Sequence, residues 1–194
     1  WLIFADAAGV GRSLVQLIQD RDGRCVLVDE DAGEDACAPE ELAALLTRPD
    51  LAGLHRVVYL GGYAPEGEDA GSEDRTTAAL LHLIQALVRS GQPLAGGLWL
   101  ATKEAQPAVT APSAAGVHGS PLWGLGRVAA LEQPGLWGGM VDLDAADPQV
   151  AAELLLAELG TLAIVWWVGS RGASSSANLQ TLVAVLIVAL IAAI

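Results

Sequence analysis

The sequence predicts an α/β fold, in which a parallel β-sheet is covered by helices on both faces. Short apolar runs of strand length alternate with longer segments whose apolar residues recur every three or four positions, which is typical of βαβ units. The chain has 194 residues, about the size of one domain, and 53% of them are hydrophobic. This composition excludes a disordered or fibrous protein and predicts one core.

Five repeats of a strand followed by a helix are readable along the chain. The predicted strands are short, mostly apolar runs at residues 1–5, 25–28, 56–60, 98–101 and 137–143. The predicted helices cover residues 12–20, a segment that starts at Pro39, residues 76–90, a segment from Pro121 to the stop at Pro134, and residues 148–159. Residues 103–120 read as a long connection. Right-handed crossovers assemble such repeats into an open, Rossmann-like parallel sheet.

The distribution of charge predicts where the domain ends. The net charge is −13, a sign that a phosphate backbone repels, so we expect no nucleic-acid partner. Every acidic residue lies at or before Glu158, and only Arg171 is charged beyond it. Residues 1–160 therefore carry a net charge of −14 and residues 161–194 carry +1. We predict a domain over residues 1–160 and a separate apolar tail over residues 161–194.

The start of the chain and its cysteines indicate the compartment. The sequence opens at Trp1 without Met, a basic region or a cleavage site, so we expect a piece of a longer, cytoplasmic polypeptide. Cys25 and Cys37 could form at most one bridge, which is too few for a disulfide scaffold. Cys25 stands in an apolar run, where a small buried thiol is the simplest interpretation.

The turn after the first strand is the natural place to look for a cofactor. Gly9 and Gly11 fit the first two positions of the dinucleotide fingerprint G-x-G-x-x-G, but Leu14 stands where its third glycine belongs. Asp29, at the end of the second strand, is where an NAD enzyme places the acid that binds ribose. We interpret the segment as a tight turn that binds no cofactor, with Gly9, Gly11 and Asp29 as weak candidates for dinucleotide binding.

No catalytic or metal-binding pattern appears. A Tyr-x-x-x-Lys pair for proton transfer to a carbonyl cannot be formed, because Lys103 is the sole lysine and the two tyrosines are Tyr59 and Tyr63. No G-x-S-x-G elbow and no phosphate-binding P-loop occur. We expect no catalytic residue and no metal site. The histidines have no metal-ligand spacing to one another or to a cysteine: they are His55, His82 and His118.

Several segments together resemble one family. They are WLIFAD with the following GVG at 9–11, RVVYL at 56–60, LWLAT at 98–102, PLWGLGRVAALEQP at 121–134 and LWGGMVDLD at 136–144. They are similar to the N-terminal, structural half of the ketoreductase region in modular type I polyketide synthases. The resemblance implies a truncated Rossmann-like fold of the short-chain dehydrogenase/reductase type, and it covers roughly residues 1–159.

The resemblance also implies what the chain does and with which partners. In the family this half binds no cofactor and braces a catalytic half, which carries the NADPH site and the catalytic Ser, Tyr and Lys. The implied partners are that catalytic half in the same polypeptide, an inserted enoylreductase and, indirectly, the acyl carrier protein that holds the β-ketoacyl chain. Our leading hypothesis is a structural subdomain without catalytic residues. The alternatives are an autonomous NAD(P)-binding protein and a domain anchored to a membrane.

The sequence departs from the family pattern after about residue 160. A Gly/Ser-rich linker at 169–177 precedes thirteen consecutive apolar residues at 182–194. Thirteen residues make a helix of about 20 Å, which is shorter than a hydrocarbon core of about 30 Å. Three interpretations stay open for this tail: a buried strand or helix, a membrane span cut by the end of the chain, or sequence foreign to the domain.

Overall fold

A computed structural model describes residues 1–29, 37–63, 72–106, 114–145 and 147–170 of the chain. Side chains are described for residues 1–29, 37–63, 74–106, 119–145 and 147–161. The chain divides into two compact units, Trp1–Leu155 and Leu156–Ile194. The strands of the sheet all belong to the first unit.

Five parallel strands form one sheet, as the sequence predicts. Its order is β2-β1-β3-β4-β5, and every pair of neighbours is parallel. The order reverses between β1 and β3, and at such a point a Rossmann fold opens a crevice outside the carboxyl ends of the strands. The bounds are β1 (Leu2–Phe4), β2 (Val26–Val28), β3 (Val57–Gly62), β4 (Leu98–Lys103) and β5 (Trp137–Leu143).

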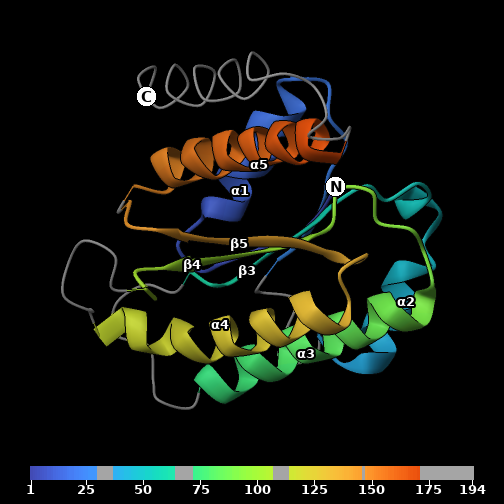
Figure 1. Cartoon of the computed structure of the whole chain (residues 1–194), viewed down its shortest axis with the longest axis horizontal. Helices are drawn as coiled ribbons and strands as arrows, with labels where there is room; N and C mark the ends of the chain where they lie inside the picture. Colours follow the sequence, from blue (N-terminus) through green and yellow to red (C-terminus); the bar gives the residue numbers. More distant parts are fainter. Residues whose placement is uncertain (30–36, 64–71, 107–113, 146, 171–194) are drawn as a thin grey trace. The chain divides into compact units, whose positions relative to one another are not determined.

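Helices cover both faces of the sheet. Figure 1 shows α2, α3 and α4 on one face, with α1 and the start of α5 on the other. The predicted α/β class is therefore confirmed. The bounds are α1 (Val10–Gln19), α2 (Pro39–Leu46), α3 (Ser72–Ser90), α4 (Ala114–Glu132) and α5 (Pro148–Ser170), and a 3-10 turn, η2 (Pro49–Leu51), precedes β3.

The main core lies between the sheet and the layer of α2, α3 and α4. Alternate strand residues point into this core. They pack against a stripe of apolar side chains on α3 at helical spacing, which includes Leu80, Leu83 and Leu87. The residues between them, such as Ile3 and Val58, are equally buried on the other face. Burial on both faces explains why these strands read as continuous apolar runs instead of alternating ones.

Three predicted helix bounds were wrong. α4 begins at Ala114, not at Pro121, which lies inside the helix. A proline is unusual there, because it removes one backbone hydrogen bond and crowds the preceding turn, although its fixed φ is helical. α3 begins four residues before the predicted position 76. α5 continues past the predicted end at 159 to Ser170, because the residues that follow include no proline and Thr161 Oγ1 donates to Ala157 O within the helix, at 2.9 Å. The predicted linker at 169–177 thus starts inside a helix.

Candidate functional site

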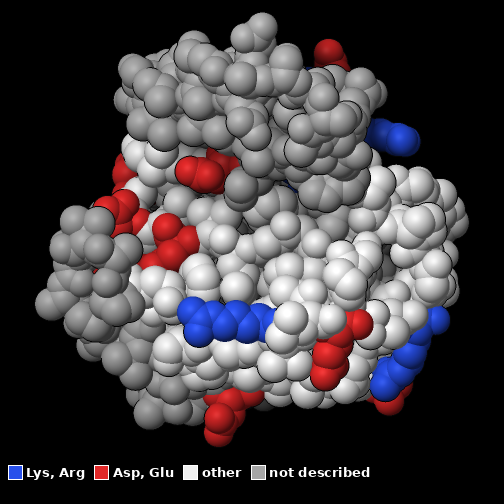
Figure 2. Space-filling model, in the orientation of Figure 1, with Lys and Arg blue, Asp and Glu red and all other residues white. Residues whose placement is uncertain are grey.

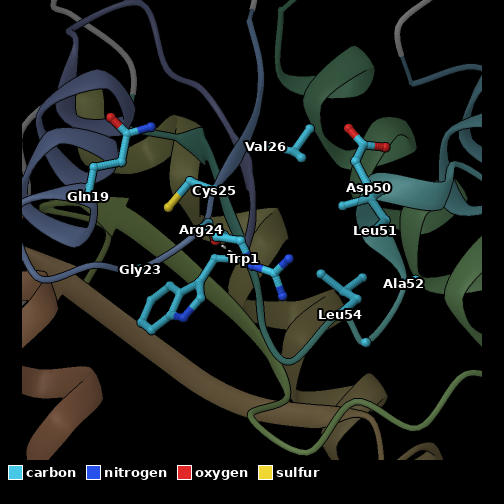
Figure 3. Close-up of a pocket in the computed structure, with 11 residues that line it drawn as sticks. Trp1, Gln19, Gly23, Arg24, Cys25, Val26, Asp50, Leu51, Ala52 and Leu54 are labelled. Atoms are coloured by element: carbon cyan, nitrogen blue, oxygen red, sulfur yellow. Dashed lines mark hydrogen bonds between the residues drawn. The ribbon is translucent and has the colours of Figure 1, made fainter.

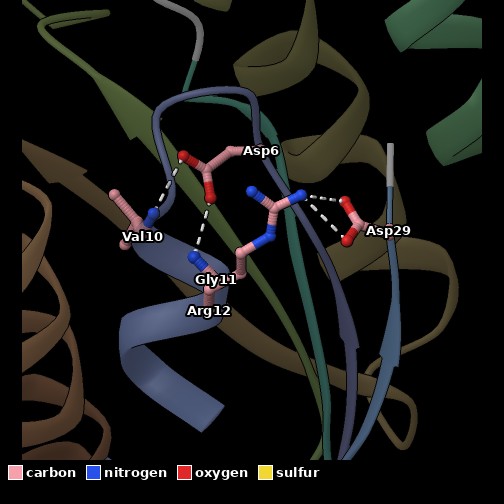
Figure 4. A network of polar contacts seen from close by, with 5 residues as sticks. All are labelled: Asp6, Val10, Gly11, Arg12 and Asp29. Carbon is pink, nitrogen blue, oxygen red and sulfur yellow. Dashed lines mark hydrogen bonds and ion pairs between the residues drawn. The ribbon is translucent and has the colours of Figure 1, made fainter. Parts of the chain in front are cut away.

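A buried carboxylate occupies the amino end of α1, at the carboxyl end of β1. Asp6 is 6% exposed, and its two oxygens accept hydrogen bonds from the backbone N–H of Val10 at 3.1 Å and of Gly11 at 2.7 Å (Figure 4). In a dinucleotide-binding Rossmann domain, a pyrophosphate lies against the helix N-terminus that follows the first strand. Here the protein supplies the anion itself.

The two glycines of the turn serve its shape and packing. Gly9 has φ +92°, a left-handed conformation that favours glycine, and no atom lies within 4 Å of where its Cβ would be. At Gly11 a Cβ would lie only 3.1 Å from Ala5 Cα and 3.1 Å from Leu60 Cδ1. Gly11 therefore lets α1 lie close to β1 and β3, and Leu14 is fully buried one turn later.

The candidate ribose acid is held by an arginine. Arg12 Nη2 donates to both carboxylate oxygens of Asp29, at 2.8 and 2.9 Å (Figure 4). Their side chains are 59% and 37% exposed, so the ion pair is solvated and adds little to stability. Its consequence is local, because a guanidinium lies on the carboxylate that a ribose would need.

The structure thus brings the three weak candidates to one end of the sheet and surrounds them with partners that the sequence did not single out. Asp6 and Arg12 are those partners. No capping signal in the sequence pointed to Asp6, because the residue that usually accepts from the start of a helix is the N-cap itself, and the N-cap of α1 is Gly9. Nothing in the spacing of Arg12 and Asp29 distinguished this pair from other exposed charges.

A tyrosine and the sole lysine do come together in space, although not in sequence. Lys103 Nζ, at the end of β4, lies 6.0 Å from the ring centroid of Tyr63, just after β3. Tyr63 is 2% exposed and its hydroxyl donates to the carbonyl of Ala145. Burial, together with the charges of Asp6 and nearby acids, raises the pKa of Tyr63 to about 12. A buried phenol with this pKa and this partner is not suited to proton transfer at neutral pH.

A second buried network joins three of the segments that carry the family resemblance. Thr102 on β4 is fully buried and donates to Asp142 Oδ1 on β5 at 2.7 Å, while Trp123 Nε1 on α4 donates to Thr102 Oγ1 at 2.8 Å. The same carboxylate accepts the backbone N–H of Ala105 at 2.9 Å and of Gln106 at 2.8 Å. The network fixes α4 and the chain after β4 against the sheet, so its polar residues are structural.

The remaining candidate ligands are dispersed. Both cysteines are free and half-buried, and burial raises the pKa of each thiol. His82 on α3 lies at the edge of the core, with Nδ1 3.2 Å from the carbonyl oxygen of Cys37. In the part of the chain that the structure describes, no group of three His, Cys, Asp or Glu side chains could hold a metal ion.

Comparison with known proteins decides the family. The model of the Rossmann fold domain of the polyketide synthase extender module SpnB matches residues 40–164. The chain belongs to this family. Polyketide synthase GfsB of Streptomyces halstedii is 32% identical over 177 residues, which cover 83% of this chain and 3% of GfsB. The first ketoreductase of the tylosin synthase superposes with a TM-score of 0.62 at 27% identity, covering 82% of this chain and 33% of that one.

The predicted resemblance to the ketoreductase region of modular polyketide synthases is confirmed. This polyketide synthase domain spans about a third of the solved ketoreductase and a few per cent of GfsB, so each is far longer than the chain. The structural network of Thr102, Trp123 and Asp142 accounts for three of the segments on which the resemblance was based.

A second similarity is of another kind. A stretch of 42 residues is 79% identical to the L-methionine/branched-chain amino acid exporter YjeH of Escherichia coli K12, and it covers 22% of this chain and 10% of the exporter. Among the helices of the described residues, none is both long enough and apolar enough to cross a membrane. The thirteen apolar residues at 182–194 lie outside the described part, so the interpretations of the tail stay predictions.

Proposed function

We propose that residues 1–160 are the non-catalytic structural subdomain of a polyketide synthase ketoreductase. They brace a catalytic half of the same polypeptide, and that half binds NADPH and reduces β-ketoacyl chains held on an acyl carrier protein. The observation that supports the proposal is the occupied cofactor end of the sheet. Asp6 accepts hydrogen bonds from the amides that would hold a pyrophosphate, and Arg12 donates to Asp29, the carboxylate that would hold a ribose.

The surface that would carry the bracing role is the open edge of the sheet beside α4. β5 is the last strand in the order and has no neighbour on its outer side among the described strands. Long apolar edge strands are normally covered, because their free N–H and C=O groups pair with other chains. Figure 2 shows that the face on which β5 and α4 lie is mainly uncharged in its described part, although the chain carries 23 acidic residues.

Two apolar side chains on α4 are exposed as well. Val128 is 48% exposed and Leu131 is 84% exposed, one turn apart on the same side of the helix. Gly124, one turn earlier, has no atom within 4 Å of where its Cβ would be, which leaves room for another backbone to approach. The solved ketoreductase is about two and a half times as long as this chain, so it has additional polypeptide that is large enough to cover such a surface.

The test uses a complete ketoreductase region in which residues 1–160 are joined to a catalytic half. Val128→Glu combined with Leu131→Glu places two carboxylates on the proposed interface and is expected to lower NADPH-dependent reduction of a β-ketoacyl thioester at least tenfold. Val150→Glu is the matched control, because Val150 on α5 is 47% exposed. Equal activities of the two variants would contradict the bracing role.

The alternative of an autonomous NAD(P)-binding protein rests on Gly9, Gly11 and Asp29. Titrating this chain with NADPH and NADH while following tryptophan fluorescence separates the two functions. Saturable quenching at micromolar concentrations supports the alternative, and no quenching supports the brace. Replacing Asp29 by Ala serves as the control, since it would weaken only binding that uses the ribose acid.

We further propose that the tail from about residue 161 is foreign to the domain and contains most of the similarity to the exporter. Three observations support this: the family match stops at residue 164, acidic residues stop at Glu158, and the compact first unit stops at Leu155. Sequencing genomic DNA across the junction tests this origin. Association with a membrane remains the competing hypothesis. Removal of residues 161–194 would then shift the protein from the membrane fraction to the supernatant.

A further inference from the structure

We propose that a slot at the amino end of the sheet receives the polypeptide that precedes Trp1 in the synthase. In the slot this polypeptide extends β1 backwards, between β2 and the turn before β3. The proposal rests on the place of this family within much longer polypeptides, and it is independent of the bracing role. It assigns the point at which the linker from the preceding part of the synthase enters the domain.

The backbone around Trp1 sets the direction of that entry. Trp1 N donates to Arg24 O at 2.7 Å, and Val26 N donates to Trp1 O at 2.8 Å, so Trp1 already belongs to the parallel ladder with β2. On the other side, Leu2 N donates to Arg56 O at 3.0 Å. β1 is thus paired on both sides up to its first residue. A residue added before Trp1 in extended conformation must leave between the chain before β2 and the chain before β3.

A pocket lies at that place. One wall consists of the end of α1 and the start of β2, and the other consists of η2 and the turn to β3, with Trp1 between them (Figure 3). Leu51 and Leu54 line the second wall but are only 3% and 7% exposed, so this wall is packed firmly against the core. The remaining lining residues are Gln19, Gly23, Arg24, Cys25, Val26, Asp50, Ala52 and Gly53. The slot lies at the amino end of β1 and is open to solvent, so an extended segment suits it better than an enclosed ligand.

The indole of Trp1 is anchored, so the strand cannot easily swing away from this line. The guanidinium of Arg56 lies 4.7 Å from the Trp1 ring centroid and 5.7 Å from that of Trp99. Arg56 is 7% exposed, and its Nε donates to Gly96 O at 3.2 Å. Cation–π contacts of a desolvated guanidinium are among the stronger ones, so this contact holds Trp1 in place at the start of β1.

The polar residues of the slot favour an occupant that offers hydrogen-bond acceptors. Asp50 is engaged by Arg48, which donates to it from Nε at 3.0 Å and from Nη2 at 2.5 Å. Arg24 lines the slot with an exposed side chain. Backbone carbonyls of an entering segment would suit this guanidinium.

The experiment compares this chain with a version that includes the ten residues encoded immediately before Trp1. We expect the added residues to slow amide hydrogen exchange at 24–26 and 52–54 at least tenfold. Ala52→Trp fills the slot and should abolish this gain without changing exchange in the shorter chain. Ala43→Trp, at an exposed alanine on α2, is the matched control and should preserve the gain. Equal protection in both versions, or equal effects of the two tryptophans, would overturn the proposal.

A second readout needs no substitution, in case Ala52→Trp fails to fold. Cys25 lines the slot and Cys37 does not, while both thiols are half-buried. The ratio of their alkylation rates with iodoacetamide, followed by mass spectrometry, should fall at least fivefold when the upstream residues are present. An unchanged ratio contradicts the proposal. Failure of the bracing role would appear only as retained reductase activity, which neither readout measures.

Discussion

Removing the Asp6 carboxylate should destabilise the domain more than removing any exposed acid. Asp6→Ala deletes the acceptor of two backbone N–H groups at the start of α1, one at 2.7 Å and one at 3.1 Å. Hydrogen bonds to charged groups contribute about 1.5–3 kcal/mol each, and loss of a helix cap costs about 0.5–2 kcal/mol. Because the longer bond is the weaker one, we expect a loss of about 3 kcal/mol in the free energy of unfolding.

The assay is urea denaturation of the full chain followed by tryptophan fluorescence. In a domain of this size 1 kcal/mol corresponds to about 2–4 °C in Tm, so Asp6→Ala should also lower Tm by about 6–12 °C. Asp6→Asn keeps one acceptor oxygen and should lose about half as much stability. Asp50→Ala is the control, because the ion pair of Asp50 with Arg48 is solvated and its loss should leave the denaturation midpoint unchanged.

The outcome that would refute this reasoning is a midpoint for Asp6→Ala equal to that of Asp50→Ala. Asp6 would then not be the anion that satisfies the start of α1. The amides at the cofactor end of the sheet would be open to another anion, and the bracing role would lose its main support.

Three further predictions concern the fold. Gly11→Ala should destabilise the domain by about 1 kcal/mol, because the added Cβ would lie 3.1 Å from its neighbours and this overpacking outweighs the gain in helix propensity. Gly124→Ala adds a Cβ in open space and should stabilise the domain by about 0.5–1 kcal/mol, and thermal denaturation of both variants measures the two signs. Asp142→Ala leaves three donors without their acceptor and should cost about 2–4 kcal/mol in urea denaturation, while Asp142→Asn should cost less. The pKa of Tyr63 is raised in the folded state, so its contribution to stability is complete below pH 10 and is lost as pH rises toward about 12. Absorbance at 295 nm follows the ionisation of tyrosine, and comparing Tyr63→Phe with the parent across this pH range checks the raised pKa.

The sequence predicted the class of the fold and the position of each strand to within two residues. This was possible because strands that are buried on both faces are continuous apolar runs in the sequence. It predicted β5 without error. It misplaced the start of α4, since proline at the first turn of a helix is a common beginning and nothing local shows that Pro121 stands in the third. It also ended α5 early, because a change from amphipathic to wholly apolar sequence resembles a boundary while leaving the backbone helical.

The candidate site was predicted in part. The part that was missed depends on the direction in which side chains point. Gly9, Gly11 and Asp29 were identified by position, and the structure brings them to the carboxyl ends of β1 and β2. Periodicity and spacing cannot show where a side chain points, so Asp6 counted as one acid among 23. The missing third glycine and the two amides, of Val10 and Gly11, that donate to Asp6 are separate observations. Both favour a sheet that keeps the shape of a nucleotide-binding fold while its own carboxylate takes the place of the phosphate, and this is the observation on which the proposed bracing role rests.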